Sequence, residues 1–123
     1  MKFISIEHER AFNEITLDID GHGYFLDTNH EALIYLLTLD TVTRSHINEL
    51  YSITEDCIRL DGLEAAWQTG TTTRVTRLAF NLWNGFTDED NATSFTPYEL
   101  FCCDYAPYFI EAIKILYPSN FLR

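Results

Sequence analysis

The sequence predicts an all-α protein, a compact single domain of six or seven short helices spanning residues 1–123. Apolar residues recur at helical spacing through most of the chain. Helix-start signals precede several of these segments. The 123 residues are 46% hydrophobic, which suits one buried core, and no repeat, low-complexity tract or interdomain linker interrupts them.

The N-terminal third should form two helices. Ser5 can cap the first helix because its hydroxyl can accept a hydrogen bond from a free N–H of the first turn. This helix should end in the glycine turn at 18–23. Its buried face should consist of His8, Ala11, Phe12, Ile15 and Ile19. Thr28 and Glu31 form a capping box ahead of a second helix at about 29–39.

The middle of the chain contains two more helix-start signals. Asp40 can cap a helix over 41–51. The apolar face of that helix should consist of Val42, His46, Leu50 and Tyr51. A loop or a short extended piece is expected around 57–60. Asp61 and Glu64 form a further capping box, which predicts a short helix after Asp61.

A longer helix is predicted in the second half of the chain. A glycine and threonine linker at 69–73 should precede a helix over about 73–84. The buried stripe of this helix should consist of Val75, Leu78, Ala79 and Leu82. Gly85 should end it, because glycine readily adopts the left-handed conformation that follows many helices.

Two prolines start the last predicted helices. Thr96 and Pro97 combine a cap with a proline in the first turn, which predicts a helix through about Cys103. Pro107 begins a final helix. Pro118 should stop it, because proline has no N–H to donate and its ring clashes with the preceding turn.

The charge of the chain is strongly negative. Nineteen acidic residues against eight basic ones give a formal net charge of −11. Such a balance repels nucleic acid and anionic membranes and attracts basic protein surfaces. The segment 65–87 differs from the rest, since it contains two arginines and no acidic residue.

Cysteine usage and hydropathy predict the compartment. The three cysteines are an odd number without a C-x-x-C pair, which favours a reducing compartment over a disulfide framework. The N-terminus becomes charged within seven residues and lacks the apolar core of a secretory signal. No apolar run approaches the roughly 20 residues of a membrane span. We therefore expect a cytoplasmic protein.

No catalytic motif stands out, so we expect no enzymatic activity and no cofactor or metal. The turn at 18–23 has two carboxylates and two glycines but lacks the further ligands of a calcium loop. Four histidines without paired Cys/His spacing do not predict a zinc site. A cysteine-dependent small enzyme is the alternative, with Cys102 or Cys103 as nucleophile and a distant histidine as base.

The segment 65–87 contains the first group of candidate partner-binding residues. Arg74 and Arg77 should share an exposed helix face with Asn81. Trp83 lies toward the edge of the buried stripe and is a candidate interface anchor, because tryptophan buries a large area at low entropic cost. Ion pairing of the two arginines with the protein's own acids is the alternative.

A second group of candidates is acidic and lies on either side of this segment. Exposed carboxylates would steer a basic partner toward the protein. The candidates are Asp56, Asp61, Glu64, Asp88, Glu89 and Asp90.

Three strings in the sequence, WQTG, RVTRLAFNL and LFCCDYAPYFIEAIKILYP, resemble an uncharacterised family of small acidic proteins from Gram-positive bacteria and their mobile elements. The resemblance covers roughly residues 30–118 and is most specific in the second half. The family brings no activity to transfer. Its mobile-element setting implies an anti-CRISPR role, since small acidic proteins of such elements often disarm host defence.

The sequence and the resemblance together predict a non-enzymatic acidic binding protein that blocks a basic surface on a protein partner. A CRISPR effector nuclease would offer such a surface, because it holds guide RNA and DNA in a positively charged channel. No direct contact with nucleic acid or membrane is expected. A homodimeric regulatory protein of a mobile element is a further alternative.

Overall fold

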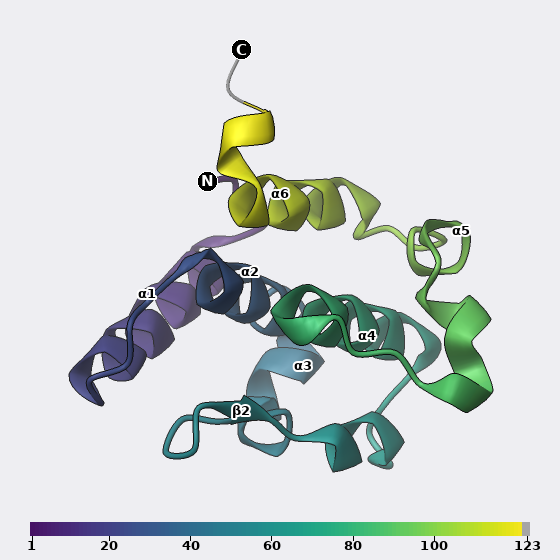
Figure 1. The fold of residues 1–123 in the computed structure, drawn as a ribbon, viewed down its shortest axis with the longest axis horizontal. Helices are drawn as coiled ribbons and strands as arrows, with labels where there is room; N and C mark the ends of the chain where they lie inside the picture. The colour runs from purple at the N-terminus through teal and green to yellow at the C-terminus, as the bar shows by residue number, and fades with distance from the viewer. Residues whose placement is uncertain (122–123) are drawn as a thin grey trace.

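The computed structural model describes residues 1–121, which form six α-helices, four 3₁₀-helices and one two-stranded hairpin (Figure 1). The predicted all-α class is therefore confirmed, with a very small sheet added. In chain order the elements are α1 (Ile6–Gly21), α2 (Thr28–Leu37), α3 (Thr41–Ser45), η1 (Ile47–Glu49), β1 (Tyr51–Ser52), β2 (Cys57–Ile58), η2 (Leu60–Glu64), α4 (Gly70–Asn84), η3 (Glu89–Phe95), α5 (Pro97–Leu100), α6 (Ala106–Leu116) and η4 (Pro118–Asn120), where η marks a 3₁₀-helix.

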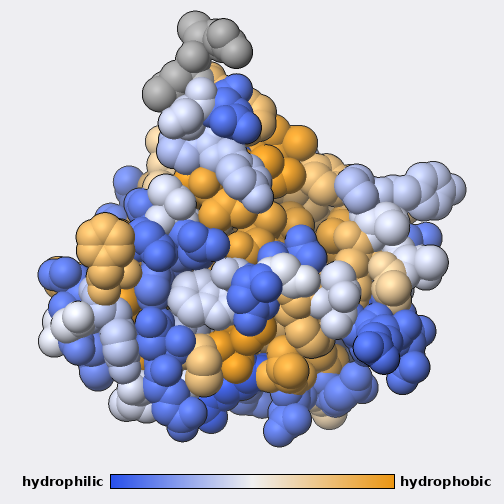
Figure 2. All heavy atoms as spheres, viewed as in Figure 1, coloured by the Kyte–Doolittle hydropathy of each residue, from blue (hydrophilic) through white to orange (hydrophobic). Residues whose placement is uncertain are grey.

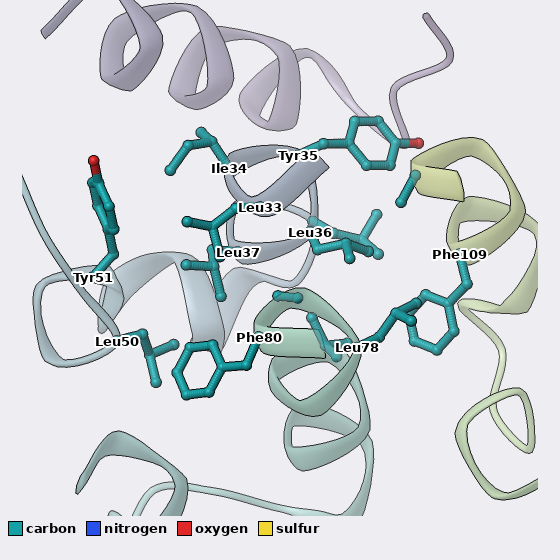
Figure 3. Close-up of a cluster of buried hydrophobic side chains, with 14 of the residues drawn as sticks. Leu33, Ile34, Tyr35, Leu36, Leu37, Leu50, Tyr51, Leu78, Phe80 and Phe109 are labelled. Carbon is teal, nitrogen blue, oxygen red and sulfur yellow. The ribbon is translucent and has the colours of Figure 1, made fainter. Parts of the chain in front are cut away.

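Helix α2 is the centre of the hydrophobic core. It contacts α1, α4 and α6, and for this reason its apolar residues are buried on every side. Figure 3 shows Leu37 directed toward Leu50 and Phe80, and Leu36 on the side where Phe109 of α6 lies. Most of the buried apolar residues form one cluster, as expected for a single core. Within residues 1–121, no helix has both the length and the apolar character needed to cross a lipid bilayer.

Helix α1 confirms the predicted cap and the predicted buried face. The Ser5 hydroxyl accepts a hydrogen bond from the His8 backbone N–H at 3.1 Å. His8, Phe12 and Ile19 are buried along the face that turns toward α2.

The His8 ring is fixed in its neutral form by two backbone groups. Its Nδ1 accepts a hydrogen bond from the Ile4 N–H at 3.2 Å, and its Nε2 donates to the Tyr35 carbonyl oxygen at 2.8 Å. Burial lowers the pKa of His8 to about 4; the hydrogen bond to Tyr35 opposes this shift, and the charge of Arg44 adds to it. A proton on Nδ1 would face the Ile4 N–H and break this arrangement.

The lowered pKa of His8 predicts a loss of stability in mild acid. The unfolded chain takes up a proton below a pH of about 6.5, whereas the folded chain resists protonation of His8 down to about 4. The free energy of unfolding should fall by roughly 2 kcal/mol more in the wild type than in His8→Gln between about pH 7 and pH 4.5. Urea unfolding at the two pH values measures this difference, with His22→Gln, at an exposed histidine, as the control. Equal losses in the wild type and His8→Gln would contradict the assignment.

The region after α1 departs from the sequence prediction in two places. The cap of α2 is Asp27 rather than Thr28, because Asp27 has an extended backbone and its carboxylate accepts from the His30 N–H at 2.9 Å. Helix α3 is capped by Asp40 as predicted but ends at Ser45. The shared helical face predicted over 41–51 is wrong, since Leu50 and Tyr51 turn into the core while Val42 stays exposed.

The short extended piece expected near Cys57 is one strand of a hairpin. Strands β1 and β2 are antiparallel and pair Tyr51 with Ile58 and Ser52 with Cys57. The capping box at Asp61 and Glu64 does not form, because η2 has already begun at Leu60 and contains both residues.

Helix α4 begins earlier than predicted. Thr69 and Thr72 form a reciprocal capping box, so the residues expected in a linker are the first turn of the helix. Its predicted stripe is buried at Val75, Leu78 and Ala79 and half-buried at Leu82. Gly85 ends the helix in the left-handed conformation, with φ +80°, as predicted.

The C-terminal helices confirm the final start and stop signals. Helix α6 begins at Ala106, beside Pro107, and ends at Leu116, just before Pro118. Helix α5 stops at Leu100, so the expectation that it continues to Cys103 is wrong. In Figure 2, hydrophobic surface gathers in the middle of the view, between α6 above and α4 below, and hydrophilic side chains dominate the lower edge.

Candidate functional site

A surface cleft lies between the β1–β2 hairpin and η2. Figure 1 shows the hairpin at the lower edge of the molecule. The volume of the cleft is about 500 Å³. The lining residues are Glu49, Ser52, Glu55, Cys57, Ile58, Arg59, Leu60, Asp61, Gly62 and Ala65. Three carboxylates and one guanidinium belong to this set, and we call it the acidic cleft.

Glu49 is held in place at the cleft by two ring N–H groups. Its carboxylate lies 2.6 Å from Nδ1 of His46 and accepts from Nε1 of Trp67 at 3.2 Å. The His46 and Trp67 rings stack with their centroids 4.4 Å apart. The hydrogen bonds from His46 and then Trp67 lower the pKa of Glu49, so this carboxylate stays ionised below the usual range for glutamate.

The acidic cleft brings together predicted and unpredicted residues. Asp61 lines it, and Glu64 is exposed at the end of the same 3₁₀-helix. Glu49 and Glu55 were not singled out from the sequence, because only the fold brings Glu49, at the end of η1, and Glu55, in the hairpin turn, to the same cleft. The available signal in the sequence was the presence of Glu49, Glu55 and Asp61 before, within and after the hairpin.

Asp56 is committed to an internal network rather than to the cleft. Its Oδ1 lies 2.7 Å from Nε2 of His30 and accepts from the Tyr51 hydroxyl at 2.7 Å. His30 is buried, and its other ring nitrogen lies 2.8 Å from Asp27 Oδ1. The His30 ring thus lies between two carboxylates, with one ring nitrogen within hydrogen-bond distance of each. Steering of a partner is therefore not a role we assign to Asp56.

The hydrogen bonds with His30 affect the pKa of Asp27 and the backbone conformation of Asp56. Partial burial works to raise the pKa of Asp27, but the hydrogen bonds from the backbone and ring of His30 outweigh it and lower the pKa below the usual value. Asp56 is the non-glycine residue with positive φ, at +51°, within residues 1–121. Aspartate tolerates this left-handed conformation better than most residues, and the hydrogen bonds to its side chain hold it there.

Trp83 is half-buried and packs against the core. Its ring meets the His30 ring edge to face at 4.8 Å and the Tyr51 ring at 6.3 Å. The expectation that it lies at the edge of the buried stripe therefore agrees with its position, while its role in partner binding stays a prediction.

The two arginines of α4 make no ion pair with a carboxylate within residues 1–121, where the recorded pairs all involve histidine. Nε of Arg74 donates to the Glu99 backbone oxygen at 3.0 Å. The Arg77 guanidinium lies over the Phe95 ring, 5.7 Å from its centroid. Both side chains thus pack locally and line a small cavity of about 260 Å³ at the start of α4.

The remaining predicted residues lie near the C-terminal end of α4 and on η3. Nδ2 of Asn81 donates to the Phe86 oxygen, and Asp88 caps η3 by accepting from the Asp90 N–H. Glu89 and Asp90 are exposed, and neither lines the acidic cleft.

Cys102 and Cys103 lie in the bends between α5 and α6. They line a cavity of about 320 Å³ together with Thr71, Asp104 and Tyr105, and no histidine belongs to that lining. The Cys103 thiol lies 3.7 Å from the Leu100 backbone oxygen, to which it donates. Over the described part of the chain, no three His, Cys, Asp or Glu side chains gather as a metal site would require.

Neither the curated proteins nor the solved structures contain a match to this chain. A family does match, and it covers residues 1–123 in full. The chain belongs to DUF6075, a family of unknown function.

Proposed function

We propose that this protein is a non-enzymatic binding protein whose acidic cleft receives a basic segment of a protein partner. One observation carries the proposal: Glu49, Glu55 and Asp61 surround a cleft of about 500 Å³ in which, among residues 1–121, Arg59 is the only basic side chain. A cleft of this kind suits a cationic side chain better than a neutral or anionic one.

The cleft also has an apolar component. Ile58, Leu60 and Ala65 contribute aliphatic surface next to the carboxylates. An arginine or lysine side chain could lay its methylene groups against this surface while its charged end pairs with the acids. The net charge of −11 would add long-range attraction to any basic partner.

A CRISPR effector nuclease is the partner class that we propose, with inhibition as the consequence. Such nucleases carry a positively charged channel for guide RNA and DNA, and an acidic protein seated there would compete with the nucleic acid. The resemblance to proteins of mobile elements supports this choice. A stable complex would also need contacts beyond the cleft, because one pocket is smaller than a standard interface.

The test is the affinity of a purified Cas9-type nuclease for two variants of equal charge. Glu55→Gln/Asp61→Asn neutralises the cleft and leaves Glu49 with its two ring partners. Glu89→Gln/Asp90→Asn removes the same number of charges on η3, outside the cleft. We expect the cleft variant to bind about tenfold more weakly and the η3 variant to change by less than about threefold.

Calorimetry at about 50 and 150 mM salt separates the effect of the cleft carboxylates from the effect of net charge. The two variants have the same net charge, so salt should weaken the long-range attraction of both to the nuclease by the same amount. Equal losses in the two variants would assign the effect to net charge rather than to the cleft. An absence of wild-type binding at the lower salt would rule out this class of nuclease as the partner.

A further inference from the structure

A second cavity, of about 420 Å³, lies where the start of α2, the end of α4 and the end of α6 meet. It is lined by Thr28, Asn29, Asn81, Leu82, Trp83, Asn84, Gly85, Leu116 and Tyr117, and we call it the amide pocket. None of these side chains is charged, although the chain carries a net charge of −11. The amide pocket therefore lacks the carboxylates that would attract a cation, and it offers no basic side chain to pair with a phosphate.

The orientation of the Asn29 amide is fixed by the end of α4. Its Nδ2 donates to the backbone oxygens of Leu82 and Trp83, each at 3.3 Å. Backbone oxygens can only accept, so the nitrogen must be the end that faces them. The Asn29 Oδ1 finds no hydrogen-bond donor within residues 1–121 and remains available as an acceptor.

The other two amides are fixed in the same way by Phe86. Nδ2 of Asn81 donates to the Phe86 oxygen at 3.1 Å, and Oδ1 of Asn84 accepts from the Phe86 N–H at 3.1 Å. The left-handed Gly85 makes this turn possible. Over residues 1–121, the Asn81 Oδ1 and the Asn84 Nδ2 have no partner, which gives the amide pocket two preset acceptors and one preset donor.

Apolar side chains complete the lining. Leu82 and Leu116 bring aliphatic surface from two helices, and the Trp83 ring is held by the neighbouring His30 ring. Figure 2 shows hydrophobic surface between α4 and α6, the helices that these leucines belong to. The lining therefore combines apolar side chains with a larger polar surface that comes mostly from the amides. A cavity with an apolar wall and oriented polar groups can hold a small molecule, and its volume lies in the usual range of roughly 300–1,000 Å³.

We propose that the amide pocket binds an uncharged ring compound with one apolar face and with N–H or O–H donors on its rim. The donors would bond the free oxygens of Asn29 and Asn81, and an acceptor on the ring would take the free N–H of Asn84. A nucleoside and a neutral sugar both have this chemistry. The proposal is independent of partner binding at the acidic cleft.

The test is a titration of the full chain by ligand-detected NMR. One arm uses adenosine, guanosine, cytidine and uridine; the other uses glucose, galactose and N-acetylglucosamine. The 5′-monophosphates and glucose 6-phosphate are the charged counterparts. We expect saturable binding in one arm with a Kd below about 1 mM, and weaker binding of the phosphorylated forms.

Asn84→Asp is the decisive variant. It keeps an oxygen to accept from the Phe86 N–H and replaces only the free nitrogen, so folding is unaffected while the preset donor is lost. Asn13→Asp makes the same change on the exposed face of α1 and is the control. We expect about tenfold weaker binding in Asn84→Asp and no change in Asn13→Asp.

Three results would overturn the proposal. One is that no neutral probe binds saturably at concentrations up to about 10 mM, roughly ten times the expected upper limit of the Kd. Another is binding of the phosphorylated forms as tight as that of the neutral ones. The third is equal binding by wild type and Asn84→Asp, which would place the ligand elsewhere on the surface.

Discussion

His30→Leu is expected to lower the free energy of unfolding by about 3 kcal/mol, because it leaves two carboxylates without their shared donor. In the wild type, the His30 ring nitrogens lie 2.8 Å from Asp27 and 2.7 Å from Asp56. Leucine has a similar volume, so the loss would reflect the missing hydrogen bonds rather than a cavity. Denaturant unfolding at neutral pH measures it.

The matched control is His46→Leu. His46 also faces a carboxylate, at 2.6 Å from Glu49, but this pair is exposed to solvent and should contribute much less to stability than the His30 contacts. Asp56→Asn added to His30→Leu should restore part of the lost stability, since an unpaired amide costs less to bury than an unpaired charge. If both histidine variants lost the same free energy of unfolding, the His30 contacts would stabilise the fold no more than an exposed ion pair does.

Gly62→Ala is the second change with a large expected effect. A Cβ on Gly62 would lie 2.4 Å from the Glu49 backbone oxygen and 2.5 Å from Cδ2 of Leu50. The backbone oxygen cannot move aside as a flexible side chain would, so η2 must shift away from the end of η1. We expect a loss of roughly 2–4 kcal/mol and a weaker interaction of the acidic cleft with its partner.

Gly21→Ala supplies the control for this prediction. No atom lies within 4 Å of a Cβ at Gly21, which is the last residue of α1. Stability should change there by less than about 1 kcal/mol, and partner binding should stay as in the wild type. Thermal unfolding of the two alanine variants gives the comparison, and a Gly62→Ala protein as stable as Gly21→Ala would show that η2 yields without cost.

Local signals predicted those elements whose ends depend on nearby residues. Ser5 caps α1, Gly85 ends α4 and Pro118 follows α6, and in each case the deciding interaction spans only a few residues. The cap of α2 was misassigned by one residue because Asp27 and Thr28 are both good caps. Only the backbone conformation distinguishes them.

The hairpin and η2 were beyond local reasoning because distant contacts form them. The strands are two residues long, too short for an alternating pattern to be visible. Gly62 is buried against Glu49, a contact that no spacing rule anticipates. The helix expected after Asp61 was wrong for this reason, and the acidic cleft that depends on η2 could not be predicted as a cavity.

For the candidate partner-binding residues too, the sequence indicated local properties but not contacts with distant residues. The sequence indicated which side chains are acidic or aromatic, and Asp61 indeed lines the cleft. It did not indicate which of the candidate side chains form hydrogen bonds within the protein, as Asp56 does with His30 and Asn81 with Phe86. Those assignments require the three-dimensional partners, which lie up to 26 residues away in the case of Asp56 and His30.

The attachment of the hairpin has a consequence for association. Two strands of two residues would be marginal by themselves. The His30–Asp56 contact ties the hairpin turn to α2, and the Tyr24 hydroxyl, in the loop before α2, donates to the Thr54 oxygen. The Arg59 N–H donates to the Leu50 oxygen and extends the pairing of the two strands. The entropy of ordering this wall is therefore lost during folding rather than during complex formation. If the acidic cleft binds a basic segment as proposed, little further ordering of this wall is needed, which leaves more of the contact energy for affinity.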